Sequence, residues 1–112
     1  MTKYRAKPTI YNGVRYASKA EAARAVELDQ MVEAGEIKGW IPQPKFRLGC
    51  PENVYVADFL VVPLDGDPDG PWVEDVKGME TPKFRRDKKL WKAYGWMRLD
   101  IKGKKDTEVV EP

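Results

Sequence analysis

The pattern of hydrophobic and polar positions predicts short strands interrupted by two helices. Residues 10–16 are typical of a small hairpin, because Asn12-Gly13 is the preferred centre of a type I′ turn, in which both residues have positive φ. Further strand segments are predicted from β-branched, apolar or edge-strand character. Residues 54–62 and 72–77 would pair as a hairpin. A short edge strand is expected around 45–48, and a last short strand over 96–101.

The two helices are marked by signals at their ends. The first is predicted over about 19–34, because Ser18 and Glu21 form a capping-box pattern at its start and a glycine follows it. The second is predicted to begin after Thr81, with proline in its first position, and to run to about Tyr94. This order of elements predicts an α/β (α+β-like) fold in which a small mixed sheet is flanked by two helices, with an N-terminal β-hairpin.

A chain of 112 residues has the length of one domain. We expect that domain to occupy residues 1–101. Within it, residues 1–9 are polar and basic and are expected to form a flexible arm. Residues 102–112 carry no core signal and are expected to form a polar C-terminal tail.

Composition removes several classes of protein and of chemistry. No apolar run reaches the ~20 residues of a membrane span, and the N-terminal residues lack the apolar stretch of a signal peptide. A single cysteine, Cys50, excludes an intrachain disulfide and a thiolate zinc site. We therefore expect a cytoplasmic protein with no membrane partner. The absence of histidine leaves carboxylates, lysine, hydroxyls or an oxygen-bound metal to carry any catalysis.

Charge is distributed unevenly along the chain. Residues 1–49 hold nine Lys or Arg against five Asp or Glu, whereas residues 50–77 hold one against seven. Residues 78–105 then hold ten basic against three acidic residues. Basic surfaces favour a phosphate-bearing partner, and an acidic centre between them favours a cation held beside that partner. Chance fluctuation of charge along a short chain is the alternative.

Two aspartates and a lysine are predicted to meet on the hairpin of residues 54–62 and 72–77. Asp58 is a lone charge in an apolar strand, where burial is costly unless the charge is paired or bound to a cation. Asp75 and Lys77 share one face of the partner strand because side chains alternate. A turn centred near residue 67 would bring Asp58 opposite them. An internal salt-bridge network is the alternative explanation.

A third carboxylate, Glu21, lies at the start of the apolar stripe of the first helix, although it could serve only the capping box. Together with Asp58 and Asp75, it suits Mg²⁺ or Mn²⁺, hard cations that prefer oxygen ligands, and the Val76 carbonyl could add another oxygen. Such a metal would neutralise a phosphate and activate water. Lys77 could orient that water or stabilise charge on the phosphate.

These residues resemble the PD-(D/E)xK nuclease superfamily, with Ala57 in place of the proline. Further matches resemble a small phage- and prophage-borne family within it: Tyr11-x-Gly13, Ser18-Lys19-x-Glu21-Ala22, Gln43-Pro44, Ala57-Asp58-Phe59, Glu74-Asp75-Val76-Lys77-Gly78 and Tyr94-Gly95. The resemblance covers about residues 4–101. It implies a restriction-endonuclease-like fold and metal-dependent hydrolysis of phosphodiesters. It also implies metal-binding roles for Glu21, Asp58 and Asp75, catalysis by Lys77, and an accessory role for Gln43.

Two basic surfaces are candidates for contact with DNA phosphates. Four residues recur at three- and four-residue steps on the second helix: Arg85, Lys88, Lys89 and Lys92. A second group lies near the N-terminus: Lys3, Arg5, Lys7 and Arg15, with Tyr4, Tyr11 or Tyr16 nearby for stacking on unpaired bases. A solvated helix face is the alternative for the first group.

The acidic residues and Lys77 between basic segments predict a Mg²⁺-dependent DNA endonuclease, and the resemblance implies one encoded by a phage and acting on branched or recombination DNA in the host cytoplasm. Cutting both strands would require a symmetric homodimer, whereas nicking requires only a monomer. Two alternatives stay open. One is a catalytically inactive nucleic-acid-binding module of the same fold, and the other is a small structural protein with an internal ion-pair cluster.

Overall fold

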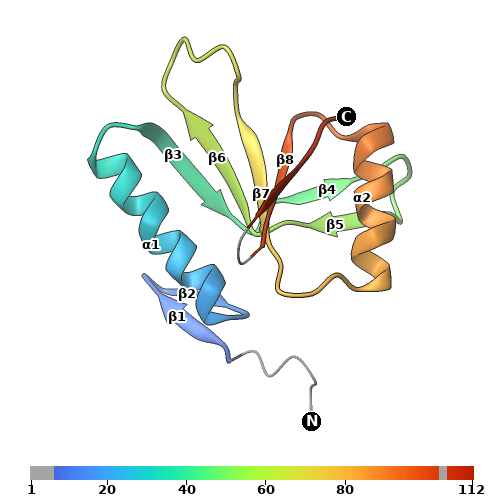
Figure 1. The fold of residues 1–112 in the computed structure, drawn as a ribbon, viewed down its shortest axis with the longest axis horizontal. Coiled ribbons are helices and arrows are strands. Elements are labelled where there is room, and N and C mark those ends of the chain that lie inside the picture. Colours follow the sequence, from blue (N-terminus) through green and yellow to red (C-terminus); the bar gives the residue numbers. More distant parts are fainter. Residues whose placement is uncertain (1–6, 104–105) are drawn as a thin grey trace.

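A computed structural model of the chain describes residues 7–103 and 106–112. The described residues form nine strands and two helices (Figure 1). In chain order these are β1 Thr9–Tyr11, β2 Val14–Tyr16, α1 Lys19–Glu33, β3 Ile37–Pro42, β4 Lys45–Arg47, β5 Val54–Val56, β6 Phe59–Pro63, β7 Trp72–Val76, α2 Pro82–Tyr94, β8 Leu99–Lys102 and β9 Thr107–Val110. The α+β architecture with two helices and a mixed sheet confirms the coarse fold prediction.

Five strands form the central sheet, in the order β3-β6-β7-β8-β9. Strands β7 and β8 are parallel and are joined by α2, whereas the other neighbouring pairs are antiparallel. Two small hairpins, β1-β2 and β4-β5, lie outside this sheet. In Figure 1, α1 with the β1-β2 hairpin and α2 with the β4-β5 hairpin lie on opposite sides of β6 and β7.

Each side of the sheet has its own hydrophobic core. On the α1 side, Phe59 and Val61 of β6 pack with Ala25 and Leu28 of the helix. On the α2 side, Val73 of β7 packs with residues of α2, β4, β5, β8 and β9, including Phe46, Tyr55, Phe84, Trp91, Leu99 and Val110. Alternation of side chains along β6 and β7 therefore supplies both cores from two adjacent strands.

The residues predicted to cap the two helices and to form the first turn have these roles in the structure. The Ser18 hydroxyl accepts a hydrogen bond from the backbone N–H of Glu21 at 3.2 Å, and Thr81 caps α2 in the same way. Asn12 and Gly13 have φ values of 52° and 80°, as a type I′ turn requires. These predictions of helix starts and of the first hairpin are confirmed.

Strand β3 is absent from the sequence prediction, which allowed only a short edge strand around 45–48. Its last residue is Pro42, and β3 is the first strand of the sheet order, so one of its edges is unpaired in the sheet. Proline is compatible with such an edge position because no ladder hydrogen bond is required there. The prolines therefore led the sequence prediction to omit β3, although an edge strand tolerates proline at this position.

The strand predicted over 54–62 is in fact two strands separated at Ala57 and Asp58. Strand β5 pairs with β4 in a separate hairpin, and β6 pairs with β3 and β7 in the main sheet. At the junction, the backbone N–H of Ala57 donates to the Pro44 carbonyl at 3.0 Å, whereas that of Asp58 donates to the Glu74 carbonyl at 3.1 Å. The chain therefore changes partners between these two residues.

The C-terminal part also differs from expectation. The last predicted strand, at 96–101, is β8 at Leu99–Lys102, and the expected polar tail over 102–112 includes β9, which pairs with β8. Val110 is 4% exposed and packs in the α2-side core. Three of the four residues of β9 are exposed, which explains why the pattern of this strand gave no core signal. No helix among the described residues is long and apolar enough to cross a bilayer.

Candidate functional site

The predicted carboxylate residues meet where α1 begins, β7 ends and the chain passes from β5 to β6. The pairing of Phe59 with Glu74 places Asp58 beside the end of β7. Asp58 Oδ2 accepts a hydrogen bond from the backbone N–H of Val76 at 2.6 Å. Val76, expected to offer its carbonyl, thus contacts the site through its amide. The predicted position of Asp58 opposite the Asp75–Lys77 segment agrees with this register.

Asp58 is the most perturbed carboxyl group of the site. Burial raises its pKa to about 10, and a hydrogen bond with Glu21 and the negative charges of Asp75 and Glu21 act in the same direction. The hydrogen bond from the Val76 amide acts in the opposite sense but is outweighed. Asp58 is therefore protonated at neutral pH; it is hydrogen-bonded to Glu21 of α1 and lies within reach of the charge of Asp75 of β7.

Asp75 is 1% exposed, and its two oxygens have different surroundings. The Tyr55 hydroxyl of β5 donates a hydrogen bond to Oδ2. The ammonium of Lys77 lies 3.0 Å from Oδ1, close enough for an ion pair. It lies outside hydrogen-bonding geometry, however, so Oδ1 has no hydrogen bond among the described residues. One oxygen is thus fixed by Tyr55 and the other is held only by charge.

Lys77 connects the site to solvent and to α2. Its side chain is 29% exposed, and its ammonium lies 4.4 Å from the centroid of the Phe84 ring. A cation over an aromatic face is attracted by the negative face of the ring. The Phe84 ring and Asp75 therefore restrain this ammonium beside the carboxylates, as the spacing of the strand predicts.

Glu21 takes part in the helix cap and also lies against Asp58. Its backbone N–H is bound by the Ser18 hydroxyl, and that hydroxyl also lies 3.3 Å from Glu21 Oε2 in hydrogen-bonding geometry. The same carboxylate acts on Asp58 through a hydrogen bond and through its charge. The cap contact holds Glu21 at the first turn of α1, where it faces the aspartates.

Gln43 contacts the site through its backbone. It has a left-handed φ of 54°, and its N–H donates to the Asp58 carbonyl at 2.8 Å. Its exposed side chain donates from Nε2 to the Arg15 carbonyl at 3.1 Å. The structure thus joins Gln43 to Asp58 and to the β1-β2 hairpin.

A buried ion pair behind the site is not among the sequence-predicted residues. The Arg24 guanidinium donates from Nε to Glu74 Oε1 and from its terminal nitrogen to Oε2, both at 2.8 Å. The Trp72 indole adds a hydrogen bond to Oε2 at 2.9 Å. Burial alone would raise the pKa of Glu74, but these hydrogen bonds and the charge of Arg24 outweigh it and lower that pKa.

The sequence contains one indication of this ion pair. Because side chains alternate along β7, Glu74 is predicted to point to the opposite face of the sheet from Asp75. The partner, Arg24, lies one helical turn after Glu21. Tyr55, the hydrogen-bond donor to Asp75, had no comparable signal. Its approach depends on the separate β4-β5 hairpin, which the sequence pattern merged with β6.

No group of three or more His, Cys, Asp or Glu side chains within residues 7–103 and 106–112 is arranged to hold a metal ion. The protonation of Asp58 is a second obstacle to metal binding. A protonated carboxyl hydrogen-bonded to Glu21 is a poor ligand for a cation, because metal binding requires the deprotonated form. The three acidic residues are therefore neighbours, with Asp58 hydrogen-bonded to Glu21 and subject to the charge of Asp75.

The predicted basic surface on α2 is divided in two. Arg85, Lys89 and Lys92 are exposed. The Lys88 side chain is 22% exposed, and its ammonium forms ion pairs with Glu80 at 2.8 Å and Glu108 of β9 at 3.1 Å. Hydrogen bonds to these carboxylates raise the pKa of Lys88. Lys88, predicted as part of the basic stripe, is therefore held by two carboxylates, whereas the other three members of the stripe are exposed.

The N-terminal basic group is described only in part. Lys7 and Arg15 are exposed, and Arg15 lies on β2 next to the side chain of Gln43. Lys3 and Arg5 lie outside the described residues.

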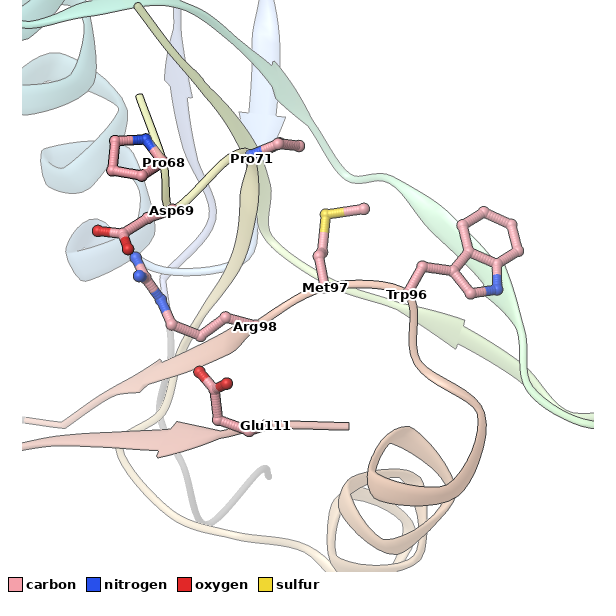
Figure 2. Close-up of a pocket in the computed structure, with 7 residues that line it drawn as sticks. All are labelled: Pro68, Asp69, Pro71, Trp96, Met97, Arg98 and Glu111. Atoms are coloured by element: carbon pink, nitrogen blue, oxygen red, sulfur yellow. The ribbon is translucent and has the colours of Figure 1, made fainter. Parts of the chain in front are cut away.

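A hollow of about 390 Å³ lies at the other end of β7 from Asp75 (Figure 2). It is lined by residues of the β6-β7 connection, by residues 96–98 and by Glu111. Its cation, Arg98, donates to Asp100 at 2.9 Å and lies over the Trp72 ring at 4.9 Å. Since this guanidinium already has a carboxylate partner, the hollow offers no free cation for an anionic ligand.

Comparison with known proteins gives one match. A protein-family model described as "Protein of unknown function (DUF1064)" matches residues 1–108. No curated protein and no solved structure matches the chain.

Proposed function

The chain belongs to the DUF1064 family, and from its carboxylate site we propose that it is a divalent-metal-dependent DNA endonuclease with a restriction-endonuclease-like fold. The observation that carries the proposal is the meeting of three acidic side chains beside one ammonium. Glu21 and Asp75 both act on Asp58, and Lys77 lies 3.0 Å from Asp75. Carboxylates and a lysine around a common point suit phosphodiester hydrolysis without histidine.

The side chains at this site supply the oxygen donors that Mg²⁺ or Mn²⁺ prefers, although no group among the described residues is arranged in advance for a metal ion. The buried Asp75 Oδ1 has no hydrogen bond among the described residues, and Asp58 and Glu21 add oxygen donors next to it. A cation bound there would neutralise charge on a phosphate and lower the pKa of water. Its binding would have to displace the proton of Asp58, so metal affinity should rise with pH.

The residues of the chain have separate tasks in this proposal. Tyr55 fixes the orientation of the Asp75 carboxylate through the hydrogen bond to Oδ2. Lys77 places a positive charge at the exposed side of the site, where it can stabilise negative charge on a phosphate. The Arg24–Glu74 pair holds α1, and with it Glu21, against β7.

Exposed cations offer contacts for the DNA backbone. Arg85, Lys89 and Lys92 supply one such surface, and Lys7 and Arg15 supply another near Gln43. We extend the proposal to a phage-encoded enzyme that acts on branched or recombination DNA in the host cytoplasm. A homodimer would be needed for a cut through both strands.

Cleavage of a panel of DNA substrates tests the proposal. Labelled duplex, single-stranded and four-way-junction DNA would be incubated with the protein and Mg²⁺ or Mn²⁺. We expect metal-dependent cleavage of at least one substrate, which a chelator abolishes. Asp75→Asn and Lys77→Met should each reduce the rate by about 100-fold or more, the range for a catalytic group.

Asp65→Asn is the matched control, because Asp65 is an exposed aspartate in the β6-β7 connection and should be dispensable. Thermal melting of each variant separates loss of activity from loss of fold. Absence of metal-dependent cleavage of every substrate by the wild-type protein would contradict the proposal.

One observation favours a second function, that of a catalytically inactive nucleic-acid-binding module. No group of acidic residues in the described part of the chain is arranged in advance for a metal ion. Calorimetry distinguishes the two functions. Failure to bind Mg²⁺ or Mn²⁺, with DNA binding intact after Asp58→Ala, would support the binding module. Metal binding that Asp58→Ala removes would support the nuclease.

A further inference from the structure

A hollow of about 380 Å³ lies between the β1-β2 hairpin, α1 and β3. Figure 1 shows the hairpin lying against the lower end of α1. Three aromatic residues from three different elements line the hollow, namely Tyr11, Tyr16 and Trp40, together with Asp29 of α1. None of these four residues has a task in the proposed hydrolysis.

This hollow adjoins the carboxylate site. Pro42 lines it, and the next residue, Gln43, donates its backbone N–H to the Asp58 carbonyl at 2.8 Å. The Tyr16 ring packs on Phe59, which follows Asp58, with ring centroids 6.0 Å apart. A strand of nucleic acid with a phosphate at the carboxylates would therefore have this hollow as an immediate neighbour.

Asp29 is held in a fixed orientation inside the hollow. The Tyr11 hydroxyl donates to its Oδ2, and the Trp40 indole N–H donates to its Oδ1 at 2.9 Å. An ionised carboxylate has about four acceptor positions, so each oxygen keeps one for a ligand. The buried hydroxyl of Tyr16, beside these groups, has no hydrogen-bond partner among the described residues. The lining thus combines the partly exposed rings of Tyr11 and Trp40 with an acceptor of hydrogen bonds, while the Tyr16 ring is buried.

The chemistry of this lining selects the ligand. Aromatic rings stack on flat ring systems, and a carboxylate accepts from N–H donors and repels anions. A phosphate is therefore excluded, whereas a nucleobase offers both a ring face and N–H groups. Guanine fits best, because its ring N–H and its exocyclic amine lie side by side and can donate to the two oxygens of one carboxylate.

We propose that this hollow binds an unpaired nucleobase, with preference for guanine, from a DNA strand that lies across the carboxylate site. The proposal rests on the proposed function for the identity of the polymer. Exposed Arg15 and Lys19, which lie in and near the elements around the hollow, supply cations for the backbone of the same strand. The substrate class is then DNA with an unpaired base next to the cleaved bond.

Binding of single-stranded oligonucleotides tests this without any need for cleavage. Fluorescence anisotropy, in the presence of a chelator, would compare an oligonucleotide containing guanine with one of equal length that has a single abasic position. We expect about tenfold weaker binding of the abasic strand, the effect of one stacked base. A 2-aminopurine at that position should lose fluorescence on binding, because stacking quenches it.

Two variants assign these effects to the hollow. Tyr11→Leu should reduce the ratio of the two affinities to about one and should abolish the quenching of 2-aminopurine. Asp29→Asn should weaken the preference for guanine over thymine while leaving stacking in place. Tyr94→Leu is the matched control, because Tyr94 is an exposed tyrosine at the end of α2 and should change neither readout.

Equal affinity for the two oligonucleotides, or no binding of either, would overturn the base-binding proposal. So would an unchanged ratio in folded Tyr11→Leu protein, with folding checked by circular dichroism. These outcomes are separate from failure of the nuclease proposal. If the protein discriminates against abasic DNA but cleaves no substrate, the base-binding proposal stands and the nuclease proposal fails. If it cleaves DNA but binds the abasic strand equally well, the nuclease proposal stands and the base-binding proposal fails.

Discussion

At the scale of single residues, the site is defined by a carboxyl group that is neutral when the protein is folded. Asp58 has a pKa of about 10 in the fold, against an ordinary value of 3.8. The folded state therefore binds this proton more tightly than the unfolded state does. The contribution of this group to stability is complete below about pH 4 and is lost progressively as the pH rises towards 10.

Asp58→Asn should remove this loss of stability at high pH. The amide keeps an oxygen for the Val76 N–H and offers its own N–H to Glu21, yet it cannot ionise. We expect the variant to be more stable than the wild type at pH 8 by about 1–2 kcal/mol, a rise in Tm of several degrees, with little difference at pH 4. Thermal melting across this pH range measures it. Parallel pH profiles for the two proteins would contradict the assigned pKa.

At the scale of elements, α1 is held to the sheet by a buried ion pair as well as by its apolar face. The helix buries Ala22, Ala25 and Leu28, whereas Arg24 reaches Glu74, which is 1% exposed. Removing one member of such a pair leaves an uncompensated buried charge, which costs more than the pair itself contributes.

Arg24→Met should therefore lower the free energy of unfolding by about 3 kcal/mol. The double variant with Glu74→Gln should recover part of that loss, because no charge then stays buried alone. Urea denaturation of the single and double variants measures the coupling. Lys38→Met, which breaks the exposed pair with Asp65, is the control and should cost less than about 1 kcal/mol. Additive effects of Arg24 and Glu74 would show that the pair is not coupled.

At the scale of the whole molecule, charge pairing decides which cations can meet a polyanion. The formal net charge is only +2, so DNA affinity would depend on local surfaces and not on the total. Lys88 and Lys89 are neighbours on α2, but their ammonium groups have different surroundings. Lys88 is tied to Glu80 and Glu108, and Lys89 is exposed.

Replacing each lysine by methionine tests this difference. If α2 contacts DNA, Lys89→Met should reduce the slope of log affinity against log salt by about 0.9 for duplex DNA, the loss of one phosphate contact. Lys88→Met should leave the slope unchanged and lower stability instead. The measurement is fluorescence anisotropy at several salt concentrations. Equal changes in slope for both variants would mean that the Glu80 and Glu108 pairs do not hold Lys88 away from DNA.

Local signals in the sequence predicted the helix ends and the first hairpin, because capping and turn chemistry act within a few residues. They also predicted that Asp58 faces the end of β7, since the midpoint of a hairpin sets the register. The break before Asp58, the edge strand β3 and the last strand β9 were missed. The first two depend on which other strand offers a partner, and the chain pattern does not contain that information, whereas β9 gave no core signal because three of its four residues are exposed. The contact of Tyr55 with Asp75 was missed for the same reason as the break before Asp58.

The connection between β6 and β7 has a practical consequence. Residues 64–71 are mostly exposed and join the two strands at the end opposite to Asp75. Extra residues in a surface turn are tolerated when the flanking strands keep their pairing. A fluorophore or an affinity peptide inserted at this turn would report on the working protein while sitting a full strand length from the acidic residues.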